Sequence, residues 1–277
     1  MVEEIRTLEL NKTWMIEQLP PSKCPIGCKW LYKVKRWADG SIKRYKARLV
    51  AKGFTQVEGI DYHETFAPMA KLVTVRCLLT VAVAKELYIH QMDVNNAFLH
   101  GDLKEEVYME LPLGFSASRN ETVCRLRKSF YVLRQASRNW FSKFADALRQ
   151  YGFLQSGADH SLFIFNRGNI FLGVLVYVDD LIIMGNNPSH YDSFKGYLDK
   201  CFRIKDLGPL KHFLGIEVTR MSSGLSLSQR KYVIDVLTEC GKLSPDQSFY
   251  YGILHYAWRV FSFVEDEETN DGFSLIC

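Results

Sequence analysis

The sequence predicts an α+β fold in which helices cover one side of an antiparallel sheet of the split βαβ type. Segments with strand and helix periodicity follow one another in the order strand, helix, strand, helix, hairpin, helix. Asp39-Gly40 stands between two runs of alternating polarity, which is among the strongest sequence signals for a β-hairpin. The apolar run 170–185 has the length of two short strands, and Asp179 and Asp180 interrupt it.

The composition is that of an ordinary globular protein, since 47% of the 277 residues are hydrophobic and 24% are charged. The net charge of +4 is modest but unevenly distributed. Positions 29–52 hold nine basic residues and one acidic residue, and positions 125–149 hold seven basic residues and one acidic residue. Two such stretches indicate contact surfaces for a polyanion, although a solvated face has the same composition.

The cysteines and the N-terminus indicate a reduced, intracellular protein, expected in the cytoplasm with access to the nucleus left open. The seven cysteines have no framework spacing, and Cys24 and Cys28 form an isolated pair that does not predict a zinc site. The N-terminus carries acidic residues early and lacks the apolar segment of a signal peptide. The apolar run 170–185 is too short and too interrupted to cross a membrane, so no membrane partner is expected.

The N-terminal part is predicted to hold a short helix and then the hairpin. Residues 1–28 begin with an amphipathic helix, marked by Ile5, Leu8 and Leu10, and continue as a loop. The hairpin pairs 29–37 with 41–50. Because side chains alternate along a strand, the returning strand is a basic ribbon with an apolar back. Its basic face is Arg44, Lys46, Arg48 and Lys52, and its apolar face is Tyr45, Ala47 and Leu49.

Two helices are predicted in the middle of the chain. After a loop at 53–71, the first helix spans 72–87, where helical spacing joins Val73, Arg76, Cys77, Thr80, Val81 and Ala84. The second lies within 129–151 and has an apolar side made of Trp140, Phe144 and Leu148.

Between these helices, the pattern indicates two short strands. The first is 88–94, which carries Asp93 near its end, and a tight turn at 95–99 with Phe98 follows it. The second is 107–110. A further strand at 161–166 then precedes the central hairpin, which pairs 170–178 with 181–184 around Asp179-Asp180.

The last predicted elements are two helices and a small hairpin. The first helix spans 192–202. The hairpin pairs 211–218 with 225–227 through Gly224, and the second helix covers 228–241 with Ser228 as its N-cap.

This fold brings three acidic residues together. Asp93 lies at the end of a central strand, and Asp179 and Asp180 form the tip of the neighbouring hairpin, so we expect them side by side. A polar turn alone explains the Asp pair, whereas three convergent carboxylates predict a site for Mg²⁺ or Mn²⁺. Two such ions, roughly 3.5–4 Å apart, stabilise the attacking and leaving oxygens of a phosphoryl displacement. Together with a basic strand, this is the outline of a nucleotidyl transferase.

Several motifs resemble a known family. Tyr177-Val178-Asp179-Asp180 inside an apolar hairpin resembles the signature of reverse transcriptases. The neighbouring motifs are similar to those of copia-type long-terminal-repeat retrotransposons, in which the reverse transcriptase is a fragment of a Gag-Pol polyprotein. They occur in family order over about residues 1–243. The motifs are RYKARLVAKGFTQ (44–56), DYHETFAPMAK (61–71), QMDVNNAFLHGDLKEEVYM (91–109), KDLGPLKHFLGIEV (205–218) and LSQRKYV (227–233).

The resemblance implies an RNA-directed DNA polymerase that transfers deoxynucleotides from dNTPs onto a primer 3′-hydroxyl. Asp93, Asp179 and Asp180 would be the catalytic and metal-binding triad for two Mg²⁺ ions, which Mn²⁺ can replace. The implied partners are an RNA template, a DNA primer and dNTPs, and the oligomeric state is left undetermined.

The resemblance also implies roles for other residues. Arg48 would hold the triphosphate, helped by Lys43 or Arg44, and Gln135 would pack near the incoming nucleotide. Phe98 would act as the aromatic gate against a ribose 2′-hydroxyl, although an ordinary core Phe fits the same pattern. Contacts to the primer would come from Tyr177, Phe213, Leu214 and Gly215.

The implied architecture is the fingers and palm of a right-hand polymerase, with a truncated thumb. The expected divisions are an N-terminal helix and lead-in at 1–28, fingers with the basic hairpin at 29–90, a palm at 91–227 with part of the fingers at 111–140, the start of the thumb at 228–243, and a divergent tail at 244–277.

The chain also departs from the family pattern. Val132 stands where the family usually has Gly, which distorts the turn if that position needs a positive φ. Residues 244–277 bear no likeness to the family. These departures favour an alternative function, a catalytically inactive retrotransposon remnant that binds nucleic acid without polymerising.

Overall fold

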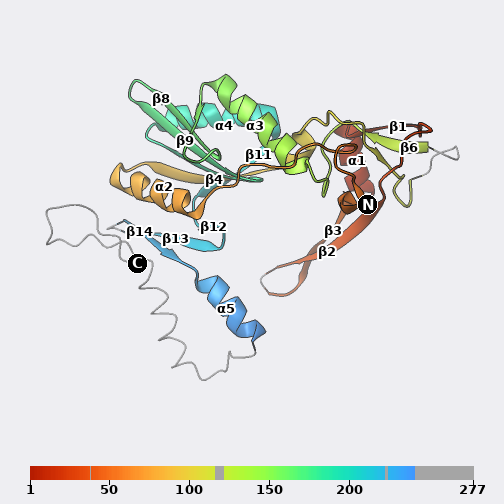
Figure 1. The fold of residues 1–277 in the computed structure, drawn as a ribbon. Helices are drawn as coiled ribbons and strands as arrows, with labels where there is room; N and C mark the ends of the chain where they lie inside the picture. The colour runs from red at the N-terminus through yellow and green to blue at the C-terminus, as the bar shows by residue number, and fades with distance from the viewer. Residues whose placement is uncertain (38, 116–121, 222–223, 241–277) are drawn as a thin grey trace, which may run out of the picture.

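The computed structural model describes residues 1–37, 39–115, 122–221 and 224–240. It is a mixed α+β protein in which all the paired strands of the sheets are antiparallel (Figure 1). This confirms the predicted α+β class with antiparallel sheets. Among the described residues, we find no helix that is both long and apolar enough to span a membrane.

A six-stranded sheet, called the main sheet below, forms the centre of the molecule. Its neighbouring strands β4 and β10 are flanked by β11 on one side and by β9, β8 and β7 on the other. The strand that was predicted at 88–94 and both arms of the central hairpin lie in this sheet. In spatial order, the strands are β11 (Ile204–Pro209), β4 (Tyr88–Val94), β10 (Asp180–Gly185), β9 (Ile170–Tyr177), β8 (Leu162–Arg167) and β7 (Leu154–Gln155).

Two helices cover one face of the main sheet, α3 (Ala136–Tyr151) and α4 (Pro188–Phe202) (Figure 1). The predicted apolar side of α3 is buried and packs with sheet residues such as Leu181 and Ile183. Helix α4 starts earlier than predicted, because Asn187 accepts a hydrogen bond from the His190 amide and Pro188 occupies the first turn.

The prediction that helices cover only one face is wrong. Helix α2 (Leu72–Ala84) packs on the opposite face, together with a small sheet. The strands of the main sheet are apolar on both faces, so both faces need cover. The buried side of α2 is Val75, Leu79 and Ala82, not the predicted set that begins with Val73. The small sheet contains β12 (His212–Phe213), β13 (Ile216–Met221) and β14 (Gly224–Ser228).

The predicted basic hairpin is present as β2 (Cys28–Arg36) and β3 (Ile42–Ala51), called the ribbon below. Figure 1 shows that its tip projects away from the rest of the molecule. In register, Lys33 lies opposite Lys46, whereas Val34 lies opposite Tyr45, so cations occupy one face and apolar side chains the other. The apolar back is buried only at the base, since Leu49 is fully buried but Tyr45 is 75% exposed.

Short elements join the ribbon to the main sheet. Helix α1 (Val2–Leu10) is the predicted N-terminal helix, and it packs against β3. A three-stranded sheet follows, of which β1 and β6 were not predicted. Its strands are β1 (Trp14–Gln18), β6 (Thr122–Leu126) and β5 (Tyr108–Met109), and short 3-10 turns lie at η1 (Gly53–Thr55) and η2 (Ala97–His100).

The last described helix is α5 (Arg230–Glu239). The predicted Ser228 cap is wrong, because Ser228 ends β14 and its hydroxyl donates to Glu217, 3.3 Å away. The helix is instead preceded by Gln229, which makes no side-chain cap hydrogen bond. The predicted divergent tail at 244–277 lies outside the described residues.

Candidate active site

Two neighbouring strands of the main sheet, β4 and β10, place acidic residues at one end. Asp180, the first residue of β10, lies directly opposite Asp93 of β4. Asp179 precedes it in the two-residue turn between β9 and β10, because Tyr177 and Asp180 are paired. The structure thus brings the three predicted carboxylate residues together, although the turn is Val178-Asp179 rather than Asp179-Asp180. Their role in catalysis stays a prediction.

The turn that carries Asp179 is held from two sides. The Trp140 indole nitrogen donates to the Val178 carbonyl at 2.7 Å, and the Val94 amide donates to the Asp179 carbonyl at 2.9 Å. Val178 has φ +55°, a conformation that costs a side-chain-bearing residue about 1–2 kcal/mol. Strain of this kind persists only where the surroundings enforce it, and here α3 and β4 do so.

The electrostatics of the acidic residues favour a bound cation. Burial raises the pKa of Asp93, and the charge of Asp179 raises it further, while nearby cations partly compensate. Burial also raises the pKa of Asp180 and outweighs the opposing hydrogen bond from Gln91, which donates at 3.2 Å. Both Asp179 and Asp93 add to that rise.

These residues fit a divalent cation by the chemistry of their donors, since three carboxylates are the hard oxygen ligands that Mg²⁺ and Mn²⁺ prefer. A cation would also relieve the repulsion that raises their pKa values. As the side chains stand, no three His, Cys, Asp or Glu side chains in the described part of the chain form a group that could hold a metal ion.

Arg48 and Phe98 meet on a single tyrosine beside this end of the sheet. The guanidinium carbon of Arg48 lies 4.8 Å from the centroid of the Tyr131 ring, within the range of a cation–π contact. Phe98 packs edge-to-face against the same ring, with a centroid distance of 6.1 Å. The residue expected to hold the triphosphate and the residue expected to act as the gate therefore share one support.

The cationic face of the ribbon is crowded with like charges. Burial lowers the pKa of Lys46, and the neighbouring cations Arg48, Arg44 and Lys35 lower it further. The charges of Lys205, Lys46 and Arg48 offset part of the rise in the pKa of Asp93, so this face and the acidic residues influence each other. A polyanion at this face would relieve the repulsion among the cations.

Lys43 and Gln135 lie in other surroundings. The Lys43 ammonium is 3.8 Å from the centroid of the Trp37 ring. Lys43 and Arg48 are five positions apart along β3, which corresponds to roughly 17 Å. Gln135 is fully buried. Its side-chain oxygen accepts from Gln56 at 3.1 Å and its nitrogen donates to the Asp61 carbonyl at 2.9 Å. Gln135 therefore holds the 53–61 segment and presents no open surface to a nucleotide in this structure.

The residues predicted to contact the primer lie around the small sheet. Tyr177 packs edge-to-face with Phe213 at a centroid distance of 6.3 Å. Phe213 itself is buried in the core of that face, so its side chain is not open to a primer. Leu214 and Gly215 both have positive φ, +51° and +78°, and form the turn between β12 and β13. A primer contact here would involve this turn.

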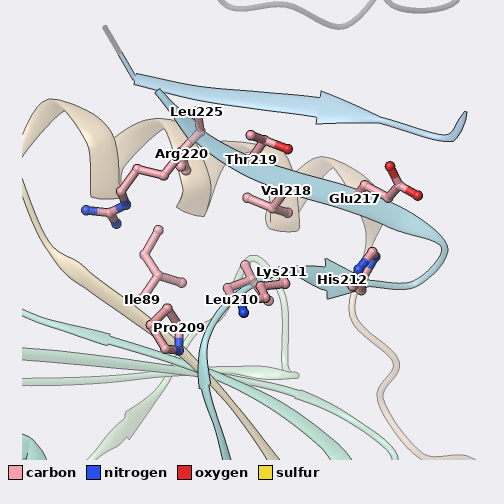
Figure 2. Close-up of a pocket in the computed structure, with 10 residues that line it drawn as sticks. All are labelled: Ile89, Pro209, Leu210, Lys211, His212, Glu217, Val218, Thr219, Arg220 and Leu225. Atoms are coloured by element: carbon pink, nitrogen blue, oxygen red, sulfur yellow. The ribbon is translucent and has the colours of Figure 1, made fainter. Parts of the chain in front are cut away.

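An open cleft of about 500 Å³ separates the small sheet from the edge of the main sheet (Figure 2). Its apolar lining includes Ile89 and Val218, and its charged lining includes Arg220 and Glu217. Ile89 and Asp93 lie on the same strand, four residues apart, roughly 13 Å. The cleft is therefore a feature apart from the acidic residues.

Sequence reasoning missed several residues of this site. Tyr131 directly precedes Val132, and no periodicity marks it as a support for Arg48 and Phe98. Lys205, which lies opposite Asp93, was missed because β11 was not predicted as a strand. The bond from Trp140 to Val178 could not be predicted, because the two residues are 38 positions apart.

Three acidic residues lie at one end of an antiparallel sheet, and the charges of the cationic ribbon reach them, which is the arrangement that the sequence led us to expect of a nucleotidyl transferase. A family model described as reverse transcriptase (RNA-dependent DNA polymerase) matches residues 11–248, and the chain belongs to that family. The family resemblance predicted from the motifs is confirmed.

Curated relatives agree with this assignment. The chain is 45% identical over 246 residues to the retrovirus-related Pol polyprotein from transposon RE1 of Arabidopsis thaliana, a match that covers 88% of this chain and 17% of the relative. It is 43% identical over 242 residues to the corresponding polyprotein from transposon TNT 1-94 of Nicotiana tabacum, covering 86% of this chain and 18% of the relative. The chain thus spans less than a fifth of these relatives.

Among solved structures, a foamy viral protease-reverse transcriptase in complex with double-stranded DNA aligns with a TM-score of 0.42 and 10% sequence identity. The alignment covers 97% of this chain and 45% of that chain. A similarity at this level carries no argument about the present chain.

Proposed function

We propose that this chain is an RNA-directed DNA polymerase domain that adds deoxynucleotides to a primer 3′-hydroxyl on an RNA template. In this proposal, the palm is 91–227 and contains the main sheet except for the first residues of β4, the ribbon belongs to the fingers, and α5 begins the thumb. The single observation that carries the proposal is the register that sets Asp180 opposite Asp93, with Asp179 in the adjoining turn.

In the proposed reaction, the primer 3′-oxygen attacks the α-phosphate of the dNTP. A new P–O bond forms, and the bond to the departing pyrophosphate breaks. Arg48 and Lys46 would bind the triphosphate oxygens, because charge-assisted hydrogen bonds suit phosphate. Phe98 would fill the space next to the sugar and thereby disfavour a ribose 2′-hydroxyl.

Asp93, Asp179 and Asp180 would hold the divalent ions. When bound, Mg²⁺ neutralises the charge that develops on the phosphate and activates the 3′-hydroxyl. The chain's own contribution is to keep the three carboxylates at one end of a buried sheet, so that little reorganisation is needed during reaction.

Primer extension on an oligo(dT)-primed poly(rA) template with Mg²⁺ tests the proposal. We expect the wild type to extend and the Asp179→Asn/Asp180→Asn variant to lose at least roughly 10³-fold in rate. The matched control is Asp146→Asn/Asp192→Asn, which removes two exposed carboxylates on α3 and α4 and should extend like the wild type. Extension that survives in the first variant would contradict the proposal.

A second candidate is an inactive remnant that binds nucleic acid without polymerising. Val132 favours it, because φ is +71° at this position, where a β-branched residue is strained. In that case neither the wild type nor the Asp179→Asn/Asp180→Asn variant would extend the primer. Both would bind primer–template, and this binding would depend strongly on salt concentration.

A further inference from the structure

Tyr131 is a buried residue whose ring, hydroxyl and carbonyl all make contacts at the proposed nucleotide site, and only 6% of it is exposed. Its ring faces the Arg48 guanidinium at 4.8 Å and contacts Phe98 at a centroid distance of 6.1 Å. Its hydroxyl donates to the Asn96 side-chain oxygen at 2.8 Å. Its carbonyl accepts from the Ala51 amide at 3.1 Å, at the base of the ribbon.

The hydroxyl bond acts on the turn that carries Phe98. Asn96 has φ +53°, a left-handed conformation, and it directly precedes the 3-10 turn η2 that contains Phe98. Asn tolerates this conformation better than most residues. A contact from outside the turn, here the Tyr131 hydroxyl, helps to hold the turn in this single conformation. Burial raises the pKa of Tyr131 to about 12, so its hydroxyl stays protonated and remains a donor at neutral pH.

The ring acts on the ribbon. The ribbon is two-stranded and exposed at its tip, so the orientation of Arg48 depends on what it touches at the base. A cation over an aromatic face is attracted by the ring's quadrupole, and this attraction is directional. The Tyr131 side chain thus contacts both regions. It contacts the ribbon at Arg48, and it contacts the turn that follows β4 at Asn96 and Phe98.

We propose that Tyr131 is a positioning residue that sets sugar selectivity, because its hydroxyl holds the turn bearing Phe98 while its ring holds Arg48. In this proposal, the contacts of Tyr131 set the distance between Phe98 beside the sugar and Arg48 at the triphosphate. This inference rests on the proposed polymerase function and deepens it, since it names which nucleotides the site excludes and how.

The hydroxyl and the ring can be separated by conservative variants. Tyr131→Phe keeps the ring and loses the bond to Asn96, so we expect kcat/KM for dNTPs to stay within about two-fold while kcat/KM for rNTPs rises roughly 3–10-fold. Asn96→Gly removes the acceptor and still allows the left-handed conformation, so it should raise rNTP use similarly. Because the two changes break the same bond, the double variant should show no further rise.

Tyr197→Phe is the matched control, because it also removes one hydroxyl bond, 2.9 Å to the Ala147 carbonyl, but in the helical layer. It should leave the dNTP to rNTP ratio unchanged. The inference is overturned if Tyr131→Phe keeps the wild-type ratio, or if it lowers dNTP and rNTP use equally, as a purely structural role would. If the wild type fails to extend with dNTPs, the proposed function fails and this inference fails with it. If the wild type extends but Tyr131→Phe keeps the wild-type ratio, only this inference fails.

Discussion

The main sheet and the ribbon are both antiparallel β structure, but burial stabilises them to very different degrees. The central strands of the main sheet are covered on both faces, by α3 and α4 on one side and by α2 and the small sheet on the other. The ribbon has two strands, and most of its residues away from the base are exposed. The proposed catalytic acids lie on the buried structure and the proposed phosphate-binding cations on the exposed one.

This difference has a functional meaning. Acids that must hold a fixed geometry are placed where the backbone has two layers of support. The cations proposed to accept a triphosphate lie on the less buried element, where Leu49 is buried and Arg48 contacts the Tyr131 ring. The following predictions test how far this contrast between the main sheet and the ribbon holds.

The largest expected effect is on stability. Phe163 of β8 is fully buried in the core beneath α3 and α4, so Phe163→Ala should lower the free energy of unfolding by about 3–5 kcal/mol. Tyr45→Ala on the ribbon removes a side chain that is 75% exposed and should change it by less than about 0.5 kcal/mol. Urea unfolding measures both, and equal effects would refute the contrast.

The next effect is on nucleotide binding. Arg48→Ala should raise KM for dNTPs roughly 10–100-fold with a smaller effect on kcat, because charge-assisted hydrogen bonds to the triphosphate are lost. Lys33→Ala removes a cation from the same face of the ribbon, at the position opposite Lys46, and should change KM by less than about three-fold. Steady-state kinetics would contradict the assignment if both variants behaved alike.

A smaller effect tests whether the main sheet also depends on polar anchors. Asp159 is buried and accepts hydrogen bonds from Thr74 and the Lys71 amide, at 2.6 and 3.2 Å, which attach the start of α2. Asp159→Asn should lower the free energy of unfolding by about 1–3 kcal/mol at pH 7. Asn186→Ala, just after the end of β10, serves as a comparison for loss of exposed side-chain hydrogen bonds.

The same anchor predicts a pH dependence. Burial alone would raise the pKa of Asp159, but hydrogen bonds from Ser161, Thr74 and Lys71 outweigh burial and lower it. A lowered pKa in the folded state adds stability that is present above the unfolded pKa of about 3.9 and is lost as pH falls through the folded value. The difference between wild type and Asp159→Asn should therefore shrink in acid, and a constant difference would contradict this account.

The smallest expected effect is on the free energy of unfolding and concerns Val132, which lies next to Tyr131 between the ribbon and the main sheet. Val132 has φ +71° and is 57% exposed, so Val132→Gly relieves strain and loses little burial. We expect the free energy of unfolding to rise by about 1 kcal/mol. Val132→Ala keeps a side chain at positive φ and should gain less. Urea unfolding of the wild type and the two variants measures the effect. A Val132→Gly variant that is less stable than the wild type would show that backbone strain at position 132 does not dominate the change in stability.

Local signals in the chain predicted the elements that place the acids. The Asp39-Gly40 turn marks the ribbon, the pattern at 88–94 matches β4, and the apolar run around Asp179 matches β9 and β10. These predictions succeeded because strand periodicity and turn residues act over a few positions. The helix α3 was predicted for the same reason, since Trp140, Phe144 and Leu148 recur at helical spacing and are all buried.

Predictions that depended on distant partners failed. The buried side of α2 was misassigned because the helix is apolar nearly all round, so only its packing on β4 and β9 selects Val75, Leu79 and Ala82. β6 and β11 are short segments that become strands by pairing with β1 and β4. Ser228 has the chemistry of a cap, but strand pairing with Glu217 uses it instead.

The sequence by itself determined the family, the α+β class and the identity of the three acids, because motifs and periodicity are properties of neighbouring residues. Only the tertiary structure decided that Gln135 is sealed in the interior and that Arg48 and Phe98 share Tyr131. Those contacts join residues 33 to 83 positions apart, and no local pattern specifies them. They form because packing brings the base of the ribbon against the turns of the main sheet, and burial then selects the partners.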